Sequence, residues 1–148
     1  MKIALIDYGS GNLQSAYKAL ELAANYEKKN KIFVTSKSKD LLLADKIVLP
    51  GVGTFSDCMR GITSIYGMID ILNEEVIQKK KPFLGICVGM QLLATKSYEN
   101  GTHLGLGWID GEIKKIPQTE LKLPHMGWNE VSIKKENKLI KHKEEKNY

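Results

Sequence analysis

The fold is decided by residues 79–93, which read KKKPFLGICVGMQLL. The short apolar run from Phe83 to Ile86 predicts a buried strand, because turn-forming residues bound it on both sides. Cys87 follows at once, between Gly85 and Gly89, and the apolar residues beyond Gly89 recur at helical spacing. A strand, a sharp turn and a helix with a cysteine at the apex make a nucleophile elbow of the G-x-C-x-G type.

The geometry of such a turn accounts for its glycines. A side chain at the apex is held in strained backbone, and a Cβ two residues away would collide with the neighbouring strand or helix. The N–H groups that open the helix favour a thiolate and can stabilise an oxyanion on a substrate carbonyl. A small buried apolar role is the alternative for Cys87, but its context favours a nucleophile. Cys58 lacks that context, and we interpret it as structural.

Length and composition restrict the class of protein. The 148 residues are enough for one domain with a sizeable core. Two cysteines indicate no disulfide framework, so a reducing, cytoplasmic location is expected. Asp7 interrupts the first apolar run, so no signal peptide is expected, and no stretch is long enough to span a membrane. No cluster of His, Cys, Asp and Glu has the spacing of metal ligands.

The formal net charge of +5 is unevenly distributed. Residues 134–148 contain six lysines and three glutamates, a composition typical of a solvated chain end. We therefore expect no nucleic-acid binding. The predicted organisation is one domain over residues 1–133 and a charged tail over residues 134–148.

Strands and helices alternate along the first part of the chain. This order predicts an α/β fold with a mostly parallel sheet covered by helices. Strands are expected at residues 2–7, 31–34 and 46–49, and helices from Leu13, near Asp40 and from Met68. Further on, two short strands are expected around a turn at Gly111.

Two glycine-rich turns follow predicted strands. Residues 8–12, YGSGN, fail as a dinucleotide fingerprint because Gln14 occupies the place of the third glycine. A plain turn and a ligand or partner site both remain open for them. Residues 50–53, PGVG, can bring backbone N–H groups close to a ligand. Ligands bind beyond the carboxyl ends of parallel strands, so this turn and Cys87 are expected to meet over one carbonyl group.

Four motifs stand in the order found in a known family. They are DYGSGNL at residues 7–13, LPGVG at 49–53, GICVGMQLL at 85–93 and PHMGWN at 124–129. Together they resemble the class I glutamine amidotransferases, and in particular the glutaminase subunits of imidazole glycerol phosphate synthase. The resemblance covers about residues 2–131.

The resemblance implies a mechanism without a cofactor. Cys87 would attack the carboxamide of glutamine and form a glutamyl thioester, and Gln91 would help to hold the glutamine. The oxyanion hole is assigned to four backbone positions, Gly51, Val52, Gly53 and Val88.

The resemblance also implies a partner. The released ammonia would pass to a cyclase subunit that makes imidazole glycerol phosphate in histidine biosynthesis, as part of a heterodimer. Asn12, Trp128 and Asn129 are the expected contacts with that subunit. For Trp128, packing in the core is the open alternative.

One part of the family pattern is not found. The family's triad also needs a His and a Glu near the C-terminal end, whereas His125 belongs to another motif and His142 lies in the charged tail. We therefore expect a truncated domain that hydrolyses glutamine slowly. Three alternatives stay open: a thiol esterase of the α/β-hydrolase type, an inactive partner-binding module, and a related amidotransferase of surface-sugar biosynthesis.

Overall fold

The computed structural model describes residues 1–24, 30–118, 123–124, 127–130 and 132. Residues Met1–Lys115 form one compact unit, and Ile116–Tyr148 form a second. The boundary after residue 133, the charged tail, His125 and His142 lie outside the described residues. Within the described ranges, no helix is long and apolar enough to cross a membrane.

The main sheet has four strands, all parallel, in the order β2-β1-β3-β4. The strands are β1 (Lys2–Ile6), β2 (Lys31–Thr35), β3 (Lys46–Leu49) and β4 (Phe83–Gly85). Each forms where an apolar or β-branched run precedes a turn, as the sequence predicts. The predicted parallel α/β sheet is therefore confirmed.

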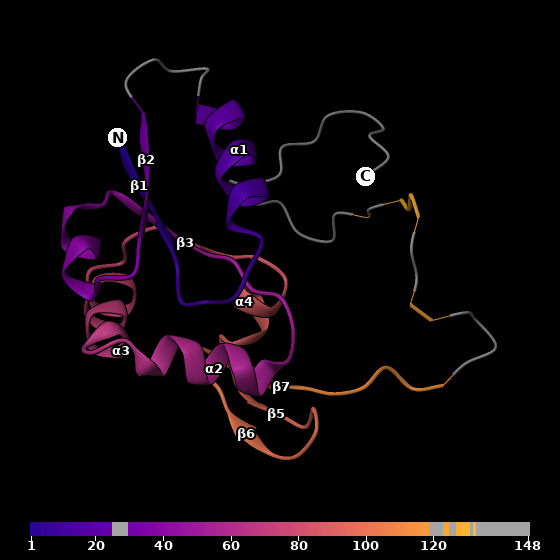
Figure 1. Ribbon diagram of the computed structural model, residues 1–148. Coiled ribbons are helices and arrows are strands. Elements are labelled where there is room, and N and C mark those ends of the chain that lie inside the picture. The colour runs from indigo at the N-terminus through magenta and orange to yellow at the C-terminus, as the bar shows by residue number, and fades with distance from the viewer. Residues whose placement is uncertain (25–29, 119–122, 125–126, 131, 133–148) are drawn as a thin grey trace. The chain divides into compact units, whose positions relative to one another are not determined.

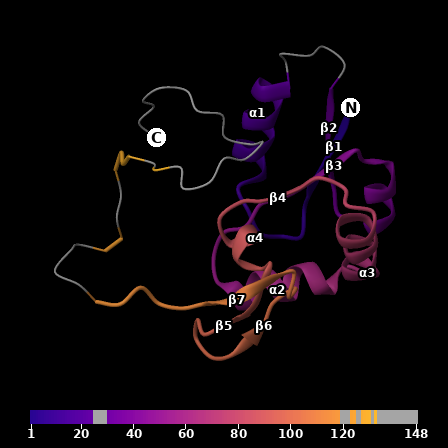
Figure 2. The same cartoon turned by 180° about the vertical axis from the view of Figure 1, so that it is seen from behind.

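Side chains of β1 alternate between two cores. Ala4 and Ile6 are buried in the larger core, whereas Ile3 and Leu5 are buried on the opposite face of the sheet, as expected for the two-residue repeat of a strand. The smaller core is covered by α1 (Leu13–Ala24). Figures 1 and 2 show α1 on one side of the strands and α3 on the other.

The larger core is covered by three helical segments. They are η1 (Ser38–Leu43), α2 (Phe55–Ser64) and α3 (Met68–Leu72), which continues into the π-helical η2 (Asn73–Gln78). Leu41, Phe55 and Met68 are fully buried there. The short helix expected near Asp40 is present as a 3₁₀ helix, and the helix expected from Met68 changes its winding midway.

The strand before Cys87 is not buried, contrary to the prediction. Leu84 is 51% exposed and Ile86 is 38% exposed. The reason is position, because β4 is an edge strand of the sheet that the described residues form, and an apolar run does not reveal whether its strand is central. The lead-in to β4 is held by Lys81, which pairs with the buried Glu75 and donates a hydrogen bond to the Leu41 carbonyl (2.9 Å).

The chain after Cys87 also differs from the prediction. Helix α4 (Val88–Gln91) has four residues, and the chain then enters a small sheet, in the order β6-β5-β7. Its strands are β5 (Ala94–Ser97), β6 (His103–Leu104) and β7 (Ile109–Ile113). Gly111 lies inside β7 rather than in a turn, because β7 pairs along its length with β5, with a register irregularity between Ala94 and Lys96.

The strand order fixes where a ligand can approach. The chain leaves β1 towards β2 on one side, and β3 lies on the other side of β1. The carboxyl ends of β1 and β3 thus form a topological switch point, where ligands bind in open parallel sheets. Residues 8–12 follow β1 and residues 50–53 follow β3, so both glycine-rich turns lie at this edge.

Candidate functional site

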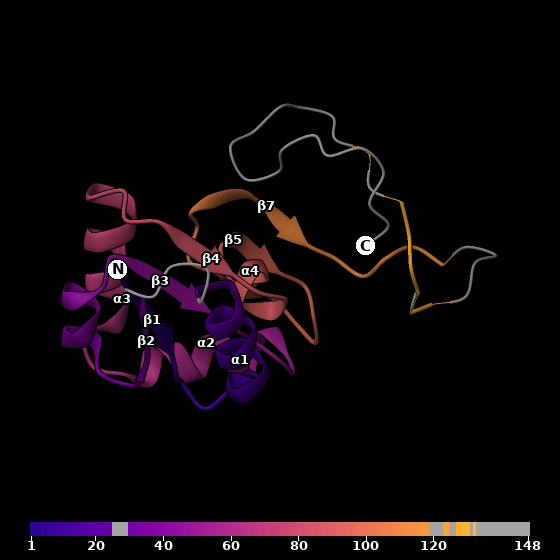
Figure 3. The same cartoon turned by 90° about the horizontal axis from the view of Figure 1, so that it is seen from above.

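Cys87 lies at the apex between β4 and α4, in strained backbone. Its φ is 56° and its ψ is −120°, a combination that non-glycine residues rarely adopt and that costs about 1–3 kcal/mol. The thiol is exposed. The predicted order of strand, sharp turn and helix is present, with β4 leading into α4 (Figure 3).

Both glycines beside Cys87 are required by close backbone contacts. A Cβ at Gly85 would lie 2.7 Å from Met90 Cα, and a Cβ at Gly89 would overlap the Leu49 carbonyl oxygen. Real Cβ atoms do not approach backbone so closely. A larger residue at either position would therefore push α4 away from the sheet.

The elbow contacts the turn that follows β3. The Ile86 N–H donates a hydrogen bond to the Leu49 carbonyl (2.9 Å), and Gly51 lies against the backbone of Val88 and Gly89. Two turns separated by more than thirty positions in the sequence are therefore adjacent. The sequence predicted this meeting from the rule that the carboxyl ends of parallel strands share one edge.

The two turns carry backbone donors without acceptors. The N–H groups of Gly51, Val52, Gly53 and Val88 donate no hydrogen bond within the part of the chain that the structure describes. Gly51 and Val88 are buried, whereas Val52 and Gly53 are exposed. Buried N–H groups normally have a partner, and free N–H groups beside a nucleophile are what an oxyanion hole needs. Whether these four groups bind an oxyanion stays a prediction.

Gln91 lies at the end of the helix that follows Cys87. It is the last residue of α4, and its backbone N–H donates a hydrogen bond to the Cys87 carbonyl (3.1 Å). The side chain is half-buried, and its amide makes no hydrogen bond to any described residue. Its amide group is thus available to a ligand, and its role stays a prediction.

The expected partner contacts are all on exposed residues. Asn12 directly precedes α1, where its Oδ1 accepts a hydrogen bond from the Ser15 N–H (3.1 Å). In the second unit, Trp128 is 81% exposed, and Asn129 Oδ1 accepts from the Glu130 N–H (2.9 Å). For Trp128, contact with a partner and packing in the core both stay predictions.

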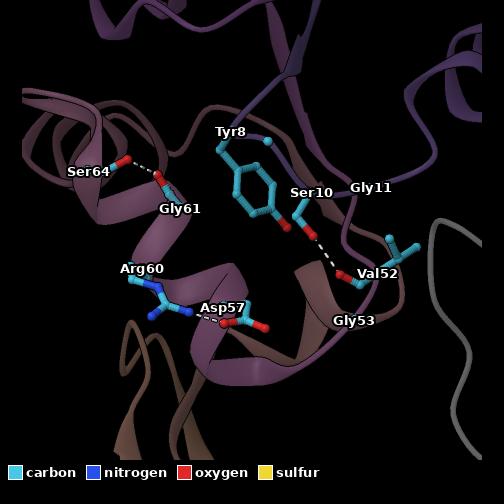
Figure 4. Close-up of a pocket in the computed structure, with 10 residues that line it drawn as sticks. Tyr8, Ser10, Gly11, Val52, Gly53, Asp57, Arg60, Gly61 and Ser64 are labelled. Atoms are coloured by element: carbon cyan, nitrogen blue, oxygen red, sulfur yellow. Dashed lines mark hydrogen bonds and ion pairs between the residues drawn. The ribbon is translucent and has the colours of Figure 1, made fainter.

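Sequence reasoning missed the side chains that hold the 50–53 turn. The Tyr8 hydroxyl donates to the Pro50 carbonyl (2.6 Å), and the Ser10 hydroxyl donates to the Val52 carbonyl (2.5 Å). Figure 4 shows Tyr8 and Ser10 pointing into a cavity of about 580 Å³ between these turns and α2. The motif placed Tyr8 at a strand end, but no pattern in the sequence names a hydrogen-bond partner forty residues away.

Glu99 is a second residue that the sequence did not single out. Its Oε2 accepts a hydrogen bond from the Phe55 N–H (2.6 Å), at the first residue of α2. A carboxylate at a helix N-terminus is favoured by the helix dipole. Glu99 thereby ties the loop after β5 to the end of the 50–53 turn. Among the described residues, no group of three or more His, Cys, Asp or Glu could hold a metal ion.

The parallel α/β sheet presents a strained, exposed cysteine beside free backbone N–H groups. This is the architecture of an elbow-type hydrolase or transferase. A model of the family described as glutamine amidotransferase class-I matches residues 4–148. The chain belongs to the class I glutamine amidotransferase family.

Within the family, the chain is similar to proteins named imidazole glycerol phosphate synthase subunit HisH. It is 50% identical to that of Bradyrhizobium diazoefficiens over 143 residues, which cover 95% of this chain and 66% of the relative. It is 52% identical to that of Rhodospirillum rubrum over 136 residues, which cover 90% of this chain and 64% of the relative. The chain thus spans less than two thirds of the length of these curated relatives.

The two cysteines are expected to differ in reactivity. Iodoacetamide at neutral pH should label Cys87, because its thiol is exposed at the elbow, and should leave Cys58 unmodified, because Cys58 is completely buried. Mass spectrometry of the digested protein measures the adducts on Cys87 and Cys58. Cys87→Ala is the control, because it removes the thiol that is expected to react. Faster labelling of Cys58 than of Cys87 in the folded protein contradicts this assignment.

Proposed function

We propose that this chain is the glutamine-hydrolysing part of an amidotransferase that delivers ammonia to a cyclase subunit. The observation that carries the proposal is the strained, exposed Cys87 beside free N–H groups in a member of the class I glutamine amidotransferase family. Strain of this kind persists where the surrounding structure maintains it, and it clusters at active sites. This favours an enzyme over a binding module without catalysis.

The proposed reaction begins with attack of the Cys87 sulphur on the carboxamide carbon of glutamine. A C–S bond forms, and the carbonyl oxygen becomes an oxyanion that accepts hydrogen bonds from N–H groups of Gly51–Gly53 and Val88. When this intermediate collapses, the C–N bond breaks and the nitrogen leaves as ammonia, after it gains a proton that balances the one lost by the Cys87 thiol. A glutamyl thioester remains on Cys87, and water then hydrolyses it to glutamate and the free thiol.

The pathway is proposed from the relatives. Those named above carry the name imidazole glycerol phosphate synthase subunit HisH, which favours histidine biosynthesis over the surface-sugar alternative. In this proposal the ammonia reaches a cyclase subunit that makes imidazole glycerol phosphate. Free ammonia is protonated and diluted in neutral water, so a glutaminase gains by docking directly on the protein that uses it.

The first test separates acylation from turnover. With glutamine in excess, the 148-residue protein should form a glutamyl adduct on Cys87, visible in the mass of the tryptic peptide, while ammonia is released slowly. Slow turnover is expected because hydrolysis of the thioester needs general acid–base help worth about 10²-fold or more. Cys87→Ala should abolish the adduct, and Cys58→Ala should retain it. An adduct that survives Cys87→Ala contradicts the proposal.

The second test concerns the partner surface. Trp128→Ala should weaken binding to a purified cyclase subunit by about 2 kcal/mol or more and leave the melting temperature nearly unchanged, because Trp128 is 81% exposed.

The other tryptophan supplies the matched control for this test. Trp108 Nε1 donates to Asn73 Oδ1 (2.8 Å), and its ring packs edge-to-face on Phe83 at 5.1 Å. Trp108→Ala should therefore destabilise the fold by about 3 kcal/mol. Isothermal titration and thermal unfolding measure the two effects. Loss of stability rather than affinity in Trp128→Ala contradicts the interface role.

A further inference from the structure

Three side chains hold two carbonyl groups of the 50–53 turn. The Tyr8 hydroxyl donates to the Pro50 carbonyl at 2.6 Å. The Ser10 hydroxyl donates to the Val52 carbonyl at 2.5 Å, and the Cys58 thiol donates to the same oxygen at 3.3 Å. Ser10 Oγ and Cys58 Sγ are themselves 3.2 Å apart. The turn is thus tied to residues of another turn and of α2.

Close packing does not hold Val52 and Gly53 in place. Val52 is 51% exposed, and a Cβ at Gly53 would meet no atom within 4 Å. The cavity of about 580 Å³ lies beside both residues and is lined also by Tyr8, Ser10 and Arg60 (Figure 4). With space available around Val52 and Gly53, the hydrogen bonds to the Val52 carbonyl decide how that peptide group is oriented. At Pro50 the hydrogen bond from Tyr8 acts together with the close backbone contact between Gly51 and Gly89.

A carbonyl held in place also sets the direction of the next N–H group. The peptide bonds of the turn are trans, so the C=O and N–H of one peptide group point in opposite directions. Holding the Pro50 carbonyl towards Tyr8 directs the Gly51 N–H away from Tyr8. Holding the Val52 carbonyl towards Ser10 and Cys58 directs the Gly53 N–H away from them. The Gly51–Val52 peptide group is fixed between these two anchors.

We infer that Tyr8, assisted by Ser10 and Cys58, is a positioning residue that orients the oxyanion donors of the 50–53 turn. The inference rests on the proposed function, since the donors matter only if a substrate carbonyl is attacked. None of the three side chains needs to touch the substrate.

The chemistry of Tyr8 suits a permanent donor. The residue is 6% exposed, and burial, with a smaller contribution from the hydrogen bond to Cys58, raises the pKa of its hydroxyl above the ordinary value. The hydroxyl therefore stays protonated at neutral pH and can donate to the Pro50 carbonyl. Phenylalanine at this position keeps the ring and removes only the donor.

The test compares two reactions of Cys87. Release of p-nitroaniline from γ-glutamyl-p-nitroanilide requires attack on a carbonyl and an oxyanion, whereas alkylation by iodoacetamide forms no oxyanion. In Tyr8→Phe the maximal rate of the first-turnover burst of p-nitroaniline should fall by about tenfold to 10²-fold, with the half-saturating substrate concentration and the alkylation rate nearly unchanged. Tyr66→Phe is the matched control, because Tyr66 is 97% exposed, and it should react like the wild type.

Ser10 gives a second, independent readout outside the core. Ser10→Ala should lower p-nitroaniline release severalfold, and Ser10→Thr, which keeps the hydroxyl, should restore it. The inference is overturned if Tyr8→Phe and Ser10→Ala both release p-nitroaniline at the wild-type rate, or if alkylation falls in parallel with release. A wild-type protein that releases no p-nitroaniline, although its Cys87 is alkylated, refutes the proposed function and the positioning role with it.

Discussion

The site depends on one contact between two backbones. Gly89, in the first turn of α4, lies directly on the Leu49 carbonyl and on Pro50, and Gly51 lies on Val88 and Gly89 with no side chain in between. Because Gly51 and Gly89 have no Cβ, the elbow and the turn after β3 approach as closely as backbone atoms allow. The nucleophile and the free N–H groups therefore reach the same edge of the sheet.

The rest of the compact unit maintains this contact. Parallel pairing of β3 with β4 brings Leu49 opposite Gly85, and the bond from the Ile86 N–H to the Leu49 carbonyl extends the pairing to the apex. The larger core fixes β3 and α2 from one face of the sheet, so the 50–53 turn is held at both ends. Strain at Cys87 of about 1–3 kcal/mol is small against the stability that a domain of this size can have.

The sequence predicted the strands and helices that short-range patterns of apolar residues specify. The apolar runs of β1 and β3 and the spacing of Leu13, Ala16 and Tyr17 in α1 identify these elements directly, since one periodicity fits each. The G-x-C-x-G pattern located the elbow, because close contacts on both sides of Cys87 exclude other residue types. The meeting of the two turns followed from a rule of topology rather than from a pattern.

The errors have a common physical cause, which is pairing between distant residues. Leu84 belongs to an apolar run but lies in an edge strand, and edge position depends on the order of all strands. Gly111 looks like a turn residue but lies inside β7, because β7 pairs with β5. The sequence predicts Tyr8 as part of a turn and of a motif but does not predict its hydrogen bond to Pro50, because that bond joins residues 42 positions apart. Such contacts leave no periodic signal in the sequence.

The central claim is that direct backbone contact at Gly89 aligns the donors with Cys87. The most direct measurement is the rate of glutamyl adduct formation on Cys87 in Gly89→Ala, divided by its rate of alkylation by iodoacetamide, in protein shown to be folded by circular dichroism. A Cβ at this position separates the elbow from the 50–53 turn, so the ratio should fall by about 10²-fold. An unchanged ratio in a folded Gly89→Ala protein would contradict the account.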